Sequence, residues 1–122
     1  MILFVFEGEE REPVVFRTLE RLFFKKQNNI ICSFGNNIYE LYQLMLSYGE
    51  DCSVVDVLKE YLSERGDDTL SGILSSHISE VFLFFDYDFQ NSHLTLVEIN
   101  HRLQAMLEMF DEETENGKLY IN

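Results

Sequence analysis

Acidic side chains follow two strongly apolar stretches of the chain. Val81–Phe85 is a run of five apolar residues. It is followed directly by Asp86 and, after Tyr87, by Asp88. The apolar stretch Ile2–Phe6 runs in the same way into Glu7. Mg²⁺ prefers hard oxygen ligands such as carboxylates, and it keeps several waters that a phosphate substrate can displace. Acids at these positions therefore predict a divalent-metal site suited to phosphodiester chemistry.

For these acids to meet, the two apolar runs must be strands of one sheet. A continuous apolar run of this length is typical of a strand buried on both faces, as in parallel sheets covered by helices. Charges do not belong inside such a sheet, so Glu7, Asp86 and Asp88 should lie just beyond its carboxyl edge, where open α/β sheets bind ligands. Carboxylates that converge there repel one another, and a bound cation removes the repulsion. We therefore expect Mg²⁺, or Mn²⁺, as the cofactor.

The rest of the chain alternates between strand and helix patterns. This order predicts an α/β fold with a mostly parallel, Rossmann-like sheet of about four strands flanked by helices. The material of about 47–79 is interpreted as a helical insertion between strands two and three. The other expected elements are a helix from Pro13, a strand at Ile30–Phe34, a helix from Ile38 capped by Asn36 or Asn37, a helix capped by Ser53, a weaker helical pattern from Leu70 to Ile78, a long helix capped by Asn91 or Ser92, and a strand from Leu119.

The length of 122 residues predicts one domain over 1–122. The chain ends at Leu119–Asn122, within an expected strand, and we interpret it as a fragment of a longer protein. Cys32 and Cys52 lack metal-ligand spacing, so reduced structural cysteines are expected. Neither a signal peptide nor an apolar run of the roughly 18 residues that a membrane helix needs is present, which predicts a cytoplasmic protein without membrane contact.

The charge balance limits the possible partners. The chain has 22 acidic against 9 basic residues and a formal net charge of -13. Tight binding to nucleic acid rests largely on Lys and Arg contacts to phosphate, so unaided binding is disfavoured. Contact with DNA or RNA through metal ions, or through a basic surface on another segment, stays open.

The acidic motifs resemble those of a known family. Phe6-Glu7-Gly8 after one strand and Phe85-Asp86-Tyr87-Asp88 after a later one resemble the Toprim domain of type IA and type II topoisomerases, DnaG-type primases and OLD-family nucleases. The opening Glu7–Pro13 is similar to that of RloB-like Toprim proteins, in which Glu-Gly is followed by Thr-Glu-Pro. Arg11 stands here in place of that Thr.

This resemblance implies a metal-dependent nuclease, a hydrolase of DNA or RNA, in a phage-defence or mobile-element system. It implies Glu7 as an acid/base residue or metal ligand, Asp86 and Asp88 as Mg²⁺ ligands, and Glu12 as a ligand of a second metal. It also implies an ATPase or another protein, or a second copy of the chain, as a partner. Nucleases of this family use a further basic residue. Only Arg102 and Lys118 follow Asp88, so that residue is expected beyond Asn122 or is absent.

Two alternatives stay open. The first is a non-catalytic Toprim-like module that binds a partner protein, which the strong negative charge favours. The second is a receiver-like phosphoacceptor domain, which also gathers acids at strand ends. That class requires a Lys after a fifth strand, and the chain lacks one.

Overall fold

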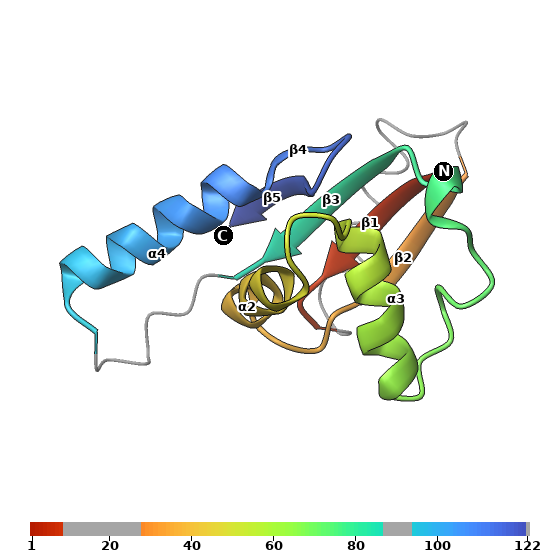
Figure 1. Cartoon of the computed structure of the whole chain (residues 1–122), viewed down its shortest axis with the longest axis horizontal. Coiled ribbons are helices and arrows are strands. Elements are labelled where there is room, and N and C mark those ends of the chain that lie inside the picture. Colours follow the sequence, from red (N-terminus) through yellow and green to blue (C-terminus); the bar gives the residue numbers. More distant parts are fainter. Residues whose placement is uncertain (9–27, 87–93, 122) are drawn as a thin grey trace.

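The computed structural model describes residues 1–8, 28–86 and 94–121. Within these residues, strands and helices alternate around a five-stranded sheet of order β2-β1-β3-β5-β4 (Figure 1). The elements in chain order are β1 (Ile2–Phe6), β2 (Asn29–Ser33), α2 (Ile38–Tyr48), α3 (Val54–Glu64), the 3₁₀ turn η1 (Ser75–His77), β3 (Glu80–Phe85), α4 (Leu96–Met109), β4 (Asp111–Glu112) and β5 (Gly117–Ile121).

The sheet is mostly parallel. β1 pairs in parallel with β2 on one side and with β3 on the other, and β3 pairs in parallel with β5. Among the strands that the structure describes, only the two-residue β4 is antiparallel to its neighbour, β5. The predicted α/β fold with a mostly parallel sheet is therefore confirmed. Among the described residues the sheet has five strands instead of about four, because β4 consists of two exposed acids that carry no apolar signal.

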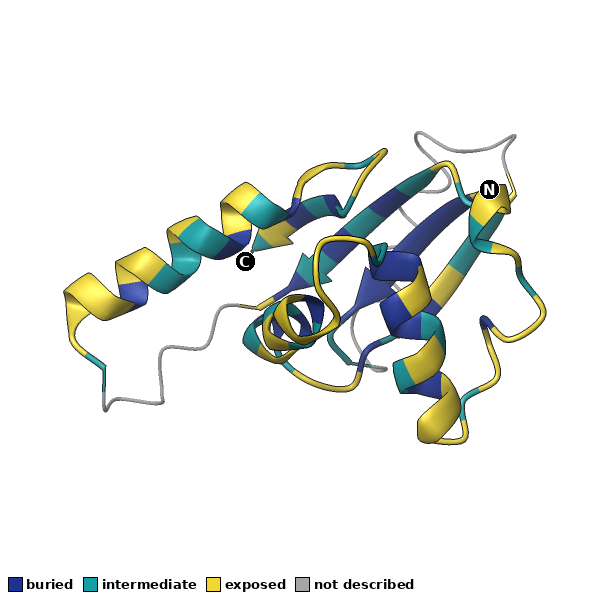
Figure 2. Cartoon of the chain, viewed as in Figure 1, coloured by how far each residue is buried: buried dark blue, intermediate teal, exposed yellow. Residues whose placement is uncertain are grey.

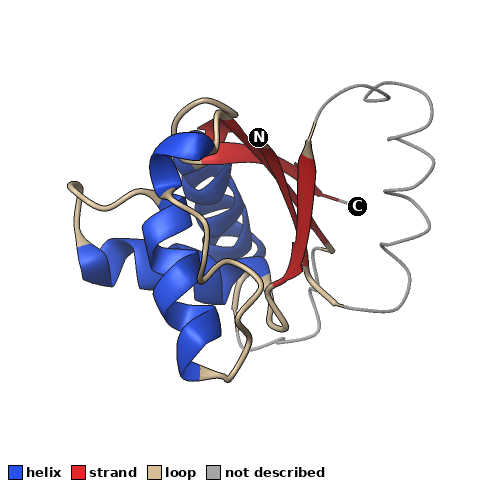
Figure 3. Ribbon diagram, turned by 90° about the vertical axis from the view of Figure 1, so that its right-hand side faces the viewer, coloured by secondary structure: helices blue, strands red, loops and turns tan. Residues whose placement is uncertain are grey.

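The helices α2, α3 and α4 lie on one face of the sheet (Figure 3). Leu3 and Val5 of β1 and Leu83 of β3 belong to the core on this face, where they are fully buried. The connections from β2 to β3 and from β3 to β5 both cross the sheet in the same direction. Right-handed crossovers therefore bring their helices to the same face.

Aromatic rings line the opposite face across three neighbouring strands. Phe4 and Phe6 of β1 are each only 1% exposed. The ring of Phe84 stacks on Phe6 at 5.2 Å and on Tyr120 at 5.3 Å between centroids. Burial on both faces explains why β1 has no alternation of polar and apolar residues. The connection 9–27, in which a helix from Pro13 is expected, lies outside the described residues.

Polar side chains cap the amino ends of the helices, as the sequence patterns indicated for two of the three. Asn37 accepts a hydrogen bond from the Glu40 amide at 2.9 Å to begin α2, and Ser53 begins α3 in the same way. For α4 the expected cap was wrong. The helix begins at Leu96, and Thr95 forms a capping box with Glu98.

The helical pattern expected from Leu70 to Ile78 is also wrong, because the chain there forms turns and the short η1. Gly72 lies in the middle of this pattern, and glycine disfavours a helix interior. Lys59 of α3 instead donates a hydrogen bond to the carbonyl oxygen of Ile73 at 2.6 Å, which fixes the turn against the core. The described helices include none that is long and apolar enough to cross a bilayer. Both cysteines are free thiols, as expected.

Replacing Gly117 by Ala tests the packing at the start of β5. Gly117 has a φ of +96°, and an added Cβ would lie 3.1 Å from Cγ1 of Val81 and 3.3 Å from Cγ of Leu83. Both the backbone strain and the crowding disfavour a side chain, so we expect a loss of about 1–3 kcal/mol in the free energy of unfolding, measured by urea denaturation.

Gly72→Ala is the matched control, because nothing lies within 4 Å of its added Cβ. A loss of similar size in both variants, or no loss at Gly117, would contradict the close approach of β3 and β5 at this point.

Candidate functional site

The pairing of β1 with β3 brings Glu7 and Asp86 to the same edge of the sheet. Phe6 and Phe84 are partners in the parallel register, so each acid follows the end of one of two neighbouring strands. The Glu7 amide donates to the carbonyl oxygen of Phe84 at 3.2 Å, which continues the pairing one residue beyond β1. The side chain of Glu7 is half-buried and that of Asp86 is exposed.

The carboxyl ends of β1 and β3 are also the place where the chain connections lead to opposite sides of β1. From β1 the chain goes to β2 on one side, and it returns across β1 to β3 on the other. In open α/β sheets such a switch point leaves a crevice at the carboxyl ends of the strands, and ligands bind there. The two acids thus occupy the place in the fold where a ligand is expected.

The loop after β2 fixes the backbone of Glu7 from the other side. The Phe34 amide donates to the carbonyl oxygen of Phe6 at 2.8 Å, and the Gly35 amide donates to that of Glu7 at 2.8 Å. Gly35 has a φ of +74°, a conformation that glycine adopts at little cost. Hydrogen bonds on both sides therefore hold Glu7 in a defined position.

Two of the four expected metal ligands, Glu12 and Asp88, lie outside the described residues. Within the described ranges, no three His, Cys, Asp or Glu side chains form a group that could hold a metal ion. Glu7 and Asp86 alone are hard oxygen donors of the kind that Mg²⁺ uses when one or two carboxylates and several waters complete its shell. The described donors therefore fit this ion as part of a ligand set.

A cavity of about 460 Å³ lies beside Glu7, at the carboxyl ends of β1 and β2. A smaller one of about 210 Å³ shares Gly8, Ser33 and Asp67 with it. The larger cavity is lined by Gly8, Ser33, Phe34, Gly35, Leu62, Arg65 and Asp67. No functional role of Ser33, Arg65 or Asp67 can be predicted from the sequence, because nothing in their local spacing links the turn after α3 to the end of β2.

The guanidinium of Arg65 is held in place at this cavity. Its Nη1 donates to the carbonyl oxygen of Phe34 at 3.0 Å and to the hydroxyl of Tyr61 at 2.8 Å. Its Cζ lies 5.2 Å from the centroid of the Tyr61 ring. A Cβ on Gly35 would lie only 2.9 Å from Nη1, so glycine there leaves room for the guanidinium.

Two acidic groups of the cavity wall have perturbed pKa values. Hydrogen bonds from the Thr69 hydroxyl and amide, together with attraction to Arg65, hold the pKa of Asp67 below its usual value, although burial opposes this. Burial and the nearby Asp67 carboxylate raise the pKa of the Cys32 thiol to about 12. The shift at Cys32 reflects its burial in the core and its closeness to the turn after α3, and the shift at Asp67 reflects the contacts within that turn.

Comparison of the chain with family models, with curated proteins and with solved structures finds no match.

Thiol labelling tests the packing of this turn on β2. An increase of the Cys32 pKa from 9.0 to about 12 lowers the thiolate fraction at pH 8 about 1000-fold. In a Cys52→Ser variant, which leaves Cys32 alone, we expect a thiol reagent to label the native protein only at the rate at which it unfolds.

The control is the same variant in urea, where Cys32 should react within the mixing time of the assay. Fast labelling of Cys32 without denaturant would show that the turn after α3 does not cover β2.

Proposed function

We propose that this chain is a Mg²⁺-dependent phosphodiesterase domain of Toprim type, which hydrolyses DNA or RNA. The observation that supports the proposal is the parallel pairing of β1 with β3, because Glu7 and Asp86 follow the ends of these neighbouring strands at the switch point of the sheet. In this function Glu7 and Asp86 hold Mg²⁺ (or Mn²⁺) together with Asp88, and Glu12 binds a second ion.

The residues around the crevice suit a phosphodiester in several ways. When bound, the metal ion stabilises negative charge on the reacting phosphate. The half-buried Glu7, whose backbone is fixed by Phe84 and Gly35, can orient an attacking water or accept its proton. Gly8 carries no side chain that would keep the substrate from the backbone. With a net charge of -13, the domain needs cations to bring a polyanion to this edge.

A non-catalytic module that binds a partner protein is the second candidate, and the surface of α4 favours it. The amino-terminal half of α4 extends away from the sheet and is largely exposed (Figure 2). Leu96 is 76% exposed and Val97 64%, and Leu107 on the same helix is 41% exposed. Exposed apolar side chains that cluster on one element are typical of protein interfaces.

Metal-dependent stabilisation separates the two candidates. If Glu7 and Asp86 bind Mg²⁺ or Mn²⁺, the wild-type chain gains about 1.4 kcal/mol of stability when the metal concentration is ten times Kd. The gain should disappear in Glu7→Gln and in Asp86→Asn. The measurement is the thermal midpoint during a metal titration at constant ionic strength.

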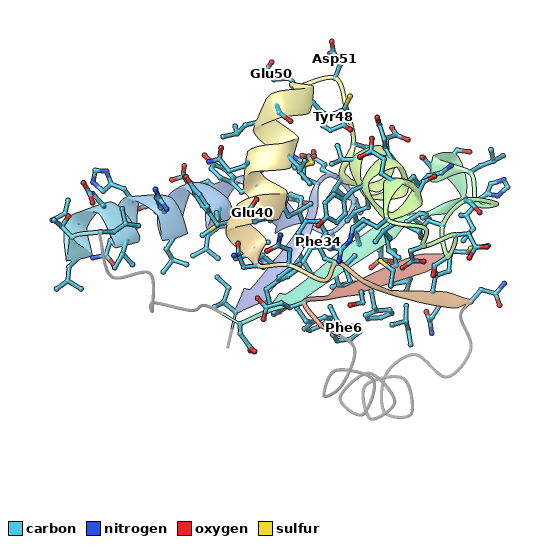
Figure 4. All side chains as sticks on the ribbon, turned by 90° about the horizontal axis from the view of Figure 1, so that it is seen from below. Phe6, Phe34, Glu40, Tyr48, Glu50 and Asp51 are labelled. Carbon is cyan, nitrogen blue, oxygen red and sulfur yellow. The ribbon has the colours of Figure 1, made fainter. Side chains whose placement is uncertain are left out.

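Asp51→Asn is the matched control. Asp51 is an exposed acid at the far end of α2 from Phe6 and Phe34, so its loss removes one charge without touching the crevice (Figure 4). Equal loss of the gain in all three variants would indicate non-specific cation binding. The absence of any gain at millimolar metal would favour the partner-binding module.

A further inference from the structure

A group of polar side chains that the proposed metal site does not use lies at the same edge of the sheet. It consists of Arg65, Ser33 and Asp67, which line the cavity of about 460 Å³ beside Gly8. We propose that this cavity is a phosphate-binding subsite, in which Arg65 supplies the positive charge and Ser33 donates a hydrogen bond to the phosphate.

Arg65 is already arranged to bind an anion. Its Nη1 is engaged by the carbonyl oxygen of Phe34 and the hydroxyl of Tyr61, while its Nη2 and Nε donate to no group in the described ranges. Arginine presents a planar set of donors that matches two oxygens of a phosphate. Because its side chain is already fixed, little conformational freedom is lost when a ligand binds.

Ser33, which lines the same cavity, has a side-chain hydroxyl without a hydrogen-bond partner. The oxygen of this hydroxyl is buried. Buried polar atoms without partners are rare in folded proteins because the lost hydration is not replaced. Ser33 lines both cavities at the end of β2, so a ligand oxygen placed there would supply the missing partner once the buried hydroxyl turns toward it.

The other Lys and Arg residues in the described part of the chain do not line this cavity. Lys59 is bonded to the carbonyl oxygen of Ile73, and Lys118 to that of Asp111. Arg102 lies over the ring of Tyr39, with its Cζ 4.2 Å from the centroid. Arg65, by contrast, lines the larger cavity at the carboxyl edge of the sheet.

Asp67 gives the proposal an unusual test, because its carboxylate opposes an anion in the same cavity. Thr69 holds this carboxylate through its amide at 3.0 Å and through its hydroxyl. The amide oxygen of Asn could accept the same two hydrogen bonds without carrying a charge. Replacing Asp67 by Asn should therefore strengthen phosphate binding while keeping the turn.

The assignment of this subsite to a phosphate of a nucleic acid rests on the proposed function. It lies beside Glu7 and Gly8, so a phosphodiester bound between Arg65 and the proposed metal site would span the end of β1. The phosphate of a free nucleotide would offer the same chemistry. A dinucleoside monophosphate and a 5′-mononucleotide are therefore compared in the test.

The experiment uses the whole chain in EDTA, so that no divalent metal contributes. Inorganic phosphate is titrated at constant ionic strength against chloride, and nitrogen–proton NMR spectra follow the Arg65 Nε–H and the Gly35 amide. We expect saturable shifts of both signals in the wild type. A nucleic-acid subsite should also bind the dinucleoside monophosphate, and a stronger response to the 5′-mononucleotide alone would assign the subsite to free nucleotides.

Four variants measure how much each side chain of the cavity contributes to phosphate binding. Arg65→Gln should weaken phosphate binding about tenfold or more, and Arg65→Lys should weaken it less, because Lys keeps the charge but lacks the planar fork. Asp67→Asn should tighten it about threefold. Ser33→Ala should weaken binding while leaving the thermal midpoint unchanged or higher, since it removes an unpaired buried hydroxyl.

The proposal is overturned if the wild type shows no saturable shift, or if Asp67→Asn, which keeps the contacts of the turn, leaves the affinity unchanged. Because the titration contains no metal, it fails or succeeds independently of the metal titration. If phosphate binds but metal does not stabilise the chain, the phosphate subsite stands and the proposed nuclease function fails. If metal stabilises the chain but phosphate does not bind, the nuclease proposal stands and the subsite fails.

Discussion

The pairing of the central strand β1 with parallel neighbours on both sides is the constraint on which the rest of this structure depends. All five residues of β1 are buried, so water cannot satisfy their amides and carbonyls. Each such group left unpaired costs about 1–3 kcal/mol, and the registers with β2 and β3 are correspondingly well defined. Those registers bring the ends of three strands together. They place Glu7 between the loop after β2 and the end of β3.

The same pairing decides the chemical character of the carboxyl edge. Apolar side chains fill both faces of β1 and of β3 from Val81 onward, so the first polar side chains at the carboxyl edge are those just beyond the strand ends. The turn after α3 adds Arg65 and Asp67 to this edge from a distant part of the chain. The edge therefore combines carboxylates, one fixed guanidinium and an unpaired hydroxyl within a mostly apolar frame.

The sequence could predict those parts of the fold that local patterns encode. The apolar runs of β1 and β3 and the caps Asn37 and Ser53 lie close to where their patterns indicated. Their burial and spacing are properties of neighbouring residues, so no long-range information was needed. The strand β4 and the turns from Leu70 could not be predicted in this way, because tertiary contacts decide their structure.

The same distinction applies to the candidate site. The order of the strands placed Glu7 and Asp86 at one edge, because parallel crossovers leave few arrangements for two buried strands. Arg65 lies directly after α3 and has no local signal of a functional role. Its partner Phe34 is 31 positions away in the sequence, and the close approach of Gly35 to its guanidinium has no local signature. A residue whose role depends on such a contact is visible only in the folded chain.

The central claim is that the ends of β1 and β3 form one metal-binding crevice. Paramagnetic broadening of amide NMR signals by substoichiometric Mn²⁺ tests it most directly, because the effect reports distance from the ion. The account predicts that the amides of Gly8, Gly35 and Asp86 broaden together, and that excess Mg²⁺ reverses the effect. Broadening confined to other acidic regions, such as β4 and the end of α2, with these three amides unaffected, would contradict it.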